Sequence, residues 1–118
     1  MHPKSQKLLE DVRVAVTFIA TATGGKSELD YLGNAVLRFA VERNFEIIGE
    51  ALGRLAKLDA ATAARISNVA LIIAFRNVLI HAYDLIDHHL VWRVIRSDLP
   101  VLLGEVTTLM REGETDAD

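Results

Sequence analysis

The sequence predicts an all-α fold, a bundle of four to five helices that run alternately up and down. In three long segments, apolar residues recur at three- and four-residue spacing, which is the period of one helix face. A further apolar run, 69–75, has no second strand candidate to pair with, so we expect it to begin a helix as well. Hydrophobic residues make up 51% of the 118 residues, and this surplus in a small domain indicates a buried interface.

The first half of the chain predicts two amphipathic helices, over about 3–22 and about 31–56. Gly24 is a candidate for a left-handed stop after the first helix, because glycine has no Cβ to clash there. Asp30 is a candidate N-cap of the second helix. The two apolar faces consist of Leu8, Val12, Ala15, Val16 and Ile19, and of Val41, Phe45, Ile48, Leu52 and Leu55.

An acidic row lies beside the apolar face of the second helix. Glu42, Glu46 and Glu50 follow one another at four-residue spacing, and Arg54 is placed to pair with Glu50. The row has two interpretations: a solvated face, or a face with one carboxylate turned inward to hold a partner arginine. Gly49 has no side chain and would let another helix approach closely.

The second half predicts a short helix within 58–65 capped by Asp59, a helix over 69–80, and a last helix over 88–110 capped by Asp87. Pro100 should kink this last helix or split it after Asp98. We expect a single domain over 1–110, followed by an acidic, frayed tail over 111–118. The core side of the last helix consists of Leu90, Val91, Val94, Ile95, Leu102, Val106 and Leu109.

The composition excludes several classes of protein. The chain has no cysteine, which removes disulfides, thiolate metal sites and cysteine nucleophiles. Its net charge is -3, so binding of nucleic acid would depend on a local patch or on a groove in a dimer. A membrane helix needs about 20 apolar residues, and no run approaches that length. With no signal-peptide core at the start, we expect a soluble cytoplasmic protein.

The segment 76–83 places reactive side chains where the apolar run ends. Arginine offers a fork of donors that matches phosphate oxygens, and histidine can take or give a proton near neutral pH. Arg76 and His81 are five residues apart, which turns a helix by roughly 140° and puts them on different faces. Either the helix loosens before His81, or the two side chains converge through a neighbouring chain. Asn77 and His81 share a face, and Arg76 is a candidate ion-pair partner for Glu50 or Glu46.

The order Arg76, four residues, His81, one residue, Tyr83 resembles the R-X4-H-X-Y signature of HepT-like toxins of the HEPN ribonuclease superfamily. The stretches 42–51 and 87–100 are similar to two helices of that family, so the resemblance spans nearly the whole chain. The chain has Ser67-Asn68 where the family often has a proline-tryptophan pair, which concerns the loop geometry rather than the chemistry.

The resemblance implies a HEPN-like homodimer with the motifs of both chains lining one cleft. It implies a metal-independent endoribonuclease without cofactor, in which Arg76 stabilises phosphate charge, His81 transfers protons, and Asn77 orients that pair, with Glu50 in a supporting role. It also implies a nucleotidyltransferase (MNT-domain) antitoxin that adds AMP to Tyr83. The added phosphates would block RNA by bulk and by charge.

Two alternatives remain. The first is a non-catalytic HEPN-like subunit that binds a nucleotidyltransferase and cleaves nothing. The second is a metal-binding bundle, suggested by Asp84, Asp87, His88 and His89 close to His81. Bundles with such sites use Glu-x-x-His pairs, which this chain lacks, and adjacent histidines point in different directions on a helix.

Overall fold

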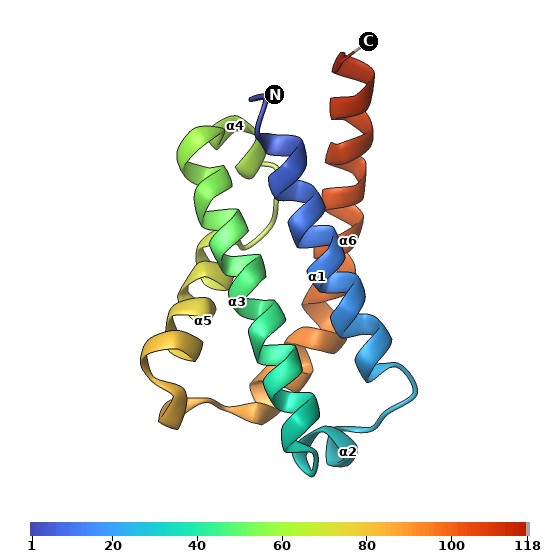
Figure 1. The fold of residues 1–118 in the computed structure, drawn as a ribbon, viewed down its shortest axis with the longest axis vertical. Coiled ribbons are helices and arrows are strands. Elements are labelled where there is room, and N and C mark those ends of the chain that lie inside the picture. The colour runs from blue at the N-terminus through green and yellow to red at the C-terminus, as the bar shows by residue number, and fades with distance from the viewer. Residues whose placement is uncertain (118) are drawn as a thin grey trace.

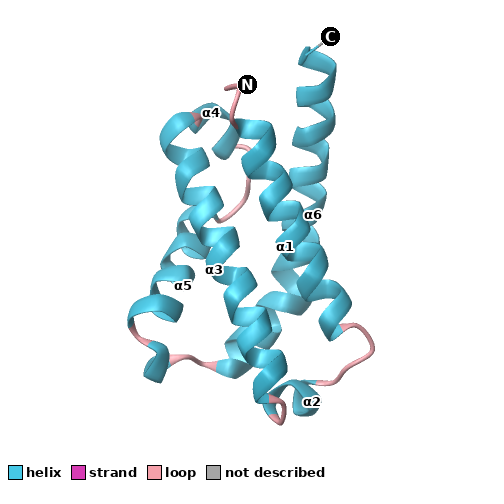
Figure 2. Cartoon of the chain, viewed as in Figure 1, coloured by secondary structure: helices cyan, strands magenta, loops and turns pink. Residues whose placement is uncertain are grey.

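The computed structural model describes residues 1–117, with side chains as far as Thr115. Within these residues every regular element is helical, as Figure 2 shows, so the all-α prediction is confirmed. Four long helices run alternately down and up, and two short helices sit at their ends (Figure 1). In chain order the elements are α1 Ser5–Thr23, α2 Glu28–Leu32, α3 Ala35–Leu58, α4 Ala60–Ala63, α5 Val69–His81, the 3-10 turn η1 Tyr83–Leu85, and α6 His88–Ala117.

The core lies between α1, α3 and α6. Every residue predicted for the apolar faces of the first two long helices is buried. Aromatic contacts close the lower end of the core, where the Tyr31 and Trp92 rings are 5.5 Å apart. The Arg96 guanidinium lies 4.4 Å from the centre of the Trp92 ring, a cation–π contact that covers the edge of the core.

The turn between α1 and α3 differs from the prediction of one helix over 31–56 capped by Asp30. Ser27 is the N-cap of the separate helix α2, and Asp30 completes a capping box by accepting the Ser27 backbone N–H at 2.9 Å. Asn34 caps α3 by accepting the Leu37 N–H at 3.0 Å. The prediction for Gly24 was also wrong, because its φ is -59° and the left-handed residue is Gly25, at +74°.

The short connection before α5 is fastened to α6. Ser67 donates its backbone N–H and its hydroxyl to the Glu105 carboxylate, both at 3.0 Å. Asn68 follows in the left-handed region with φ 61°, a conformation that asparagine adopts more readily than most residues. These contacts anchor the two residues from which α5 starts.

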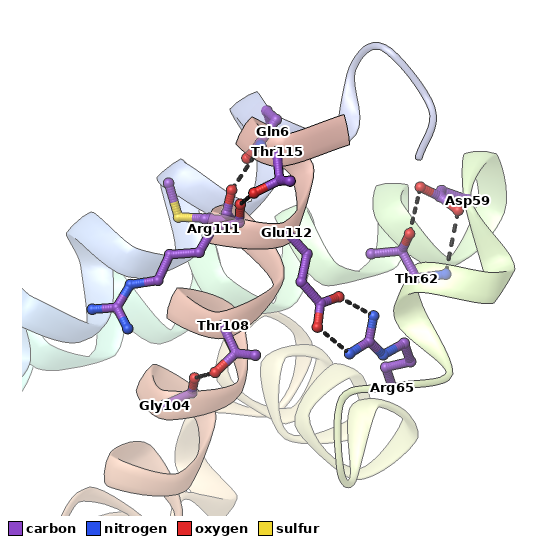
Figure 3. Close-up of polar contacts among 10 residues, drawn as sticks. Gln6, Asp59, Thr62, Arg65, Gly104, Thr108, Arg111, Glu112 and Thr115 are labelled. Atoms are coloured by element: carbon purple, nitrogen blue, oxygen red, sulfur yellow. Dashed lines mark hydrogen bonds and ion pairs between the residues drawn. The ribbon is translucent and has the colours of Figure 1, made fainter. Parts of the chain in front are cut away.

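The last helix is longer than predicted. It is continuous across Pro100, so a split after Asp98 is wrong, and Figure 1 shows its first turns inclined to the later part. It also continues to Ala117, so the frayed tail over 111–118 is wrong for 111–117, while Asp118 lies outside the described residues. Figure 3 shows what holds this end: Arg65 forms a two-pronged ion pair with Glu112, and Gln6 donates to the Met110 carbonyl at 2.9 Å. At its start, Asp87 accepts the His89 N–H at 3.0 Å, which confirms this cap.

Helix α5 is the most apolar helix and yet the least covered. Leu79 is its one buried residue. The helix packs on α3, where the rings of Phe75 and Phe45 meet edge to face with their centres 5.1 Å apart. Between α5 and α6 lies an apolar cavity of about 320 Å³, with Leu71 65% exposed and Val101 55% exposed on its walls. Leu90, predicted to be core, is 40% exposed on the same cavity, because α5 does not close against α6 there.

None of the helices in the described part of the chain combines the length and the hydropathy that a membrane span requires.

Candidate active site

The motif residues lie along the lower half of α5 and on the turn that follows it. The helix is unbroken through His81, and the Ala82 N–H still donates to the Val78 carbonyl at 2.9 Å. The proposal that the helix loosens before His81 is therefore wrong. Arg76 and His81 keep the different directions that helical geometry gives them. Within one chain, Arg76 turns toward α3 and His81 ends the helix.

Arg76 approaches α3 at Gly49, where the prediction of close helix approach is confirmed. A Cβ atom on Gly49 would lie 2.6 Å from Cγ of Arg76 and closer still to its Cβ. The aliphatic stem of Arg76 thus occupies the space that any other residue at position 49 would fill. This contact directs the guanidinium along α3 toward the next residue, Glu50.

Glu50 and Asn77 hold the Arg76 guanidinium. Nη2 donates to Oε2 of Glu50 at 2.9 Å, and Nη1 donates to Oδ1 of Asn77 at 3.0 Å. The Arg76 side chain is 26% exposed, and its Nε is buried without a hydrogen-bond partner among the described residues. The acidic row combines its two interpretations, because Glu50 holds Arg76 but its own side chain is 46% exposed and not turned inward. The predicted pair of Arg54 with Glu50 is also present, at 3.0 Å.

His81 and Tyr83 are open to solvent. His81 is the last residue of α5 and is exposed. Tyr83 begins η1 and is 78% exposed. Both side chains are accessible to a large substrate or to a second protein.

A polar hollow of about 380 Å³ lies beside Arg76, between α1, α3 and α5. Its charged lining comes from side chains at three- and four-residue spacing on α3, together with one residue of α1 and one of α5. Sequence reasoning missed this hollow because the 43, 46, 50, 54 stripe has the same period as an ordinary solvated face. The charged side chains that line it are Asp11, Arg43, Glu46, Glu50, Arg54 and Arg76.

The metal-binding alternative has no geometric basis within the described residues, where no three His, Cys, Asp or Glu side chains gather closely enough to hold an ion. His89 pairs with Glu28 at 2.8 Å, and Asp87 is occupied as the cap of α6. His88 turns inward instead, and burial lowers the pKa of its imidazole. These side chains serve the junction of α2 with α6.

Comparison with known proteins agrees with this arrangement. A family model described as "Ribonuclease HepT-like" matches residues 12–109, which include all of α3, α5 and η1. The chain belongs to the HepT-like ribonuclease family.

Relatives within this family carry matching names. A "Probable ribonuclease HepT" of Thermococcus cleftensis is 31% identical over 111 residues, which cover 94% of this chain and 100% of that protein. A putative RNase of Methanocaldococcus jannaschii is 37% identical over 79 residues, or 65% of this chain and 70% of that protein. A putative RNase of Caldanaerobacter subterraneus subsp. tengcongensis is 28% identical over 104 residues, or 88% of this chain and 92% of that protein. No solved structure matches the chain significantly.

Proposed function

We propose that this HepT-like protein is a metal-independent endoribonuclease and the toxin of a toxin–antitoxin pair. The observation that carries the proposal is Arg76, held by Glu50 and Asn77 on the same helix that ends in the exposed His81. A fixed guanidinium and an accessible imidazole are sufficient for RNA cleavage, because the RNA supplies its own nucleophile.

The cleavage would proceed by internal transfer at phosphorus. His81 takes the proton of the ribose 2'-hydroxyl as that oxygen forms a bond to phosphorus. The bond from phosphorus to the 5'-oxygen breaks, and this oxygen leaves with the proton that the imidazolium of His81 returns. The products are a 2',3'-cyclic phosphate and a free 5'-hydroxyl. Arg76 stabilises the charge that develops on the phosphate oxygens, and Asn77 keeps its guanidinium oriented.

A second copy of the chain would complete the site. Arg76 and His81 point in different directions on one unbroken helix. A second α5 that faced the first would bring Arg76 of one chain near His81 of the other, in one cleft. The apolar wall around Leu71 and Val101 supports such a partner, since exposed apolar surface of this kind marks an interface. In a symmetric dimer the same patch of both chains meets, which would place the two motifs together.

Tyr83 would be the point of control rather than part of the chemistry. It is 78% exposed and two residues after His81, so a nucleotidyltransferase antitoxin could reach its hydroxyl and transfer AMP to it from ATP, with release of pyrophosphate. Each AMP adds a phosphate and a nucleoside next to the cleft, which repels RNA by charge and by volume. Incubation with that enzyme and ATP should add AMP to the wild type and none to Tyr83→Phe; an equal mass increase in both would disprove this role.

The decisive experiment is cleavage of RNA by the purified protein in the presence of EDTA. We expect cyclic-phosphate products, and a rate at least about 100-fold lower for His81→Ala, the usual size of a general acid–base contribution. His89→Ala is the matched control, because His89 is another exposed histidine but pairs with Glu28. A folded dimer that leaves RNA intact would favour the non-catalytic partner-binding subunit.

A further inference from the structure

The hollow beside Arg76 holds charged groups that the proposed cleavage does not use. Arg54 and Arg43 line it with side chains that are 67% and 69% exposed. Each is held by a carboxylate one turn away on α3: Arg54 by Glu50 at 3.0 Å, and Arg43 by Glu46 at 3.1 Å. These pairs restrict where the two guanidinium groups lie and leave both groups open to a ligand.

Glu50 is shared by two arginines. Its Oε1 accepts from Nε of Arg54 at 3.1 Å and lies 3.0 Å from Nη2 of the same arginine. Its Oε2 accepts from Nη2 of Arg76 at 2.9 Å. One negative charge therefore stands between two positive charges. Arg54 and Arg76 lie on either side of the same carboxylate, although they come from different helices.

The six charged side chains of the hollow sum to zero, but Lys7, outside its lining, neutralises Asp11, and this leaves a positive surplus around Glu50. Asp11 pairs with Lys7, and Glu46 pairs with Arg43, so these two pairs are neutral. The group of Arg54, Glu50 and Arg76 retains a charge of one positive unit. In a chain whose net charge is -3, such a patch is a local attraction for an anion.

We propose that this hollow binds an RNA phosphate next to the one that is cleaved, with Arg54 as its principal contact. The inference rests on the proposed ribonuclease function. Arg76 serves the reacting phosphate, and Arg54 lies on the other oxygen of Glu50, so consecutive phosphates of one strand could contact both guanidiniums. In the contacts of the described residues Nη1 of Arg54 is not engaged, and its N–H groups can donate to phosphate oxygens. The hollow would then fix the register of the RNA strand, and this phosphate contact would carry no base specificity.

The test measures binding of an RNA oligonucleotide with 2'-O-methyl groups throughout, which cannot be cleaved by 2'-hydroxyl attack. Fluorescence anisotropy over a series of salt concentrations gives the affinity and its salt slope. We expect Arg54→Gln to bind several-fold more weakly, and its slope to fall by about 0.7, the value for one lost phosphate contact on a single strand. Arg54→Lys should restore the slope but not the full affinity, because lysine lacks the two-pronged donor.

Arg13→Gln is the matched control, since Arg13 is a helical arginine, 40% exposed, that pairs with Glu10 at 2.6 Å and does not line the hollow. It should bind like the wild type. With cleavable RNA, Arg54→Gln should raise KM more than it lowers kcat, the reverse of Arg76→Gln.

The outcomes separate the two ideas. Equal affinity and salt slope for the wild type and Arg54→Gln would disprove the phosphate site. The proposed ribonuclease function would still stand if the wild type cleaved RNA. Weaker binding by Arg54→Gln without any cleavage would support the phosphate site and disprove the ribonuclease. A wild type that binds no RNA would overturn both.

Discussion

Arg76 owes its position to a residue that has no side chain. Gly49 leaves room for the arginine stem, and the adjacent Glu50 then receives its guanidinium at 2.9 Å. Two consecutive residues of α3 thus position the group that we assign to phosphate stabilisation. The position of Arg76 is set by packing against its stem as well as by charge.

Replacement of Gly49 by alanine should displace Arg76. The new methyl group would overlap Cβ and Cγ of Arg76, so α5 must shift or the arginine must change rotamer. We expect the free energy of unfolding to fall by about 1–3 kcal/mol, the usual cost of overpacking. RNA cleavage should fall at least about tenfold, since misplacement by an ångström is costly in catalysis. Urea unfolding and initial cleavage rates measure the two effects.

Gly53→Ala is the control for this experiment. Gly53 lies on the same helix, but a Cβ there would have no atom within 4 Å. Alanine should stabilise the protein by about 0.5–1 kcal/mol at this helical position and leave cleavage unchanged. If Gly49→Ala behaved like Gly53→Ala, the packing account of Arg76 would be wrong.

At the scale of the elements, Asp59 joins three helices at the upper end of the bundle. Its carboxylate accepts from the Ser5 hydroxyl at 2.6 Å and from the Thr62 hydroxyl at 2.7 Å, and it caps α4 through the Thr62 N–H. Hydrogen bonds from Ser5 and Thr62 hold the pKa of this carboxyl well below its ordinary value of 3.8. Asp59 therefore binds the start of α1 to the corner between α3 and α4.

Asp59→Ala should lower the free energy of unfolding by about 2 kcal/mol, through a lost cap and an unpaired hydroxyl on the buried Ser5. Because the folded-state pKa is depressed, the stabilisation is present above the unfolded value near 3.8 and is lost as pH falls below it. Urea unfolding should give a lower free energy of unfolding for the variant than for the wild type at pH 7. This difference should become smaller when the pH is lowered below 3.8. A deficit that stayed constant with pH would contradict the electrostatic part of this account.

At the scale of the whole molecule, the exposed apolar side of α5 predicts that a second chain binds there. Helix α5 is strongly apolar but has one buried residue, so much hydrophobic surface is left in water. A second copy that covers this surface would gain about 25 cal/mol of stabilising free energy for each Å² buried. We therefore expect a dimer of the 13.0 kDa chain in solution.

Leu71→Glu should convert this dimer to a monomer. Leu71 is 65% exposed in the single chain, so a carboxylate there should change the stability of the monomer little. In the dimer the same charge would be buried in the interface and would oppose association. Val36→Glu is the control, because Val36 is 80% exposed on α3 and does not line the cavity between α5 and α6. Sedimentation velocity and circular dichroism measure mass and helicity, and RNA cleavage should be lost with the dimer. A wild type that remained monomeric at micromolar concentration would refute the dimer.

The helices and their buried faces could be predicted from the sequence because they depend on near neighbours. The three- and four-residue spacing identified the buried faces of α1 and α3, and Asp59 and Asp87 were recognisable caps. The turn 24–34 was not predictable in detail, since Asp30 and Asn34 compete as caps with Ser27. The tail was misjudged because Glu112 is held by Arg65, which is distant in the chain.

The order Arg76, His81, Tyr83 and the family it indicates follow from the primary structure, because side-chain identity and spacing are local properties. The surroundings of these residues required the packed molecule. The Gly49 contact, the sharing of Glu50 by Arg54 and Arg76, and the uncovered wall of α5 all join segments far apart in the chain. Helical periodicity predicts which face of a helix is apolar, but not which other helix lies against it; the packing of α3 against α5 settles that.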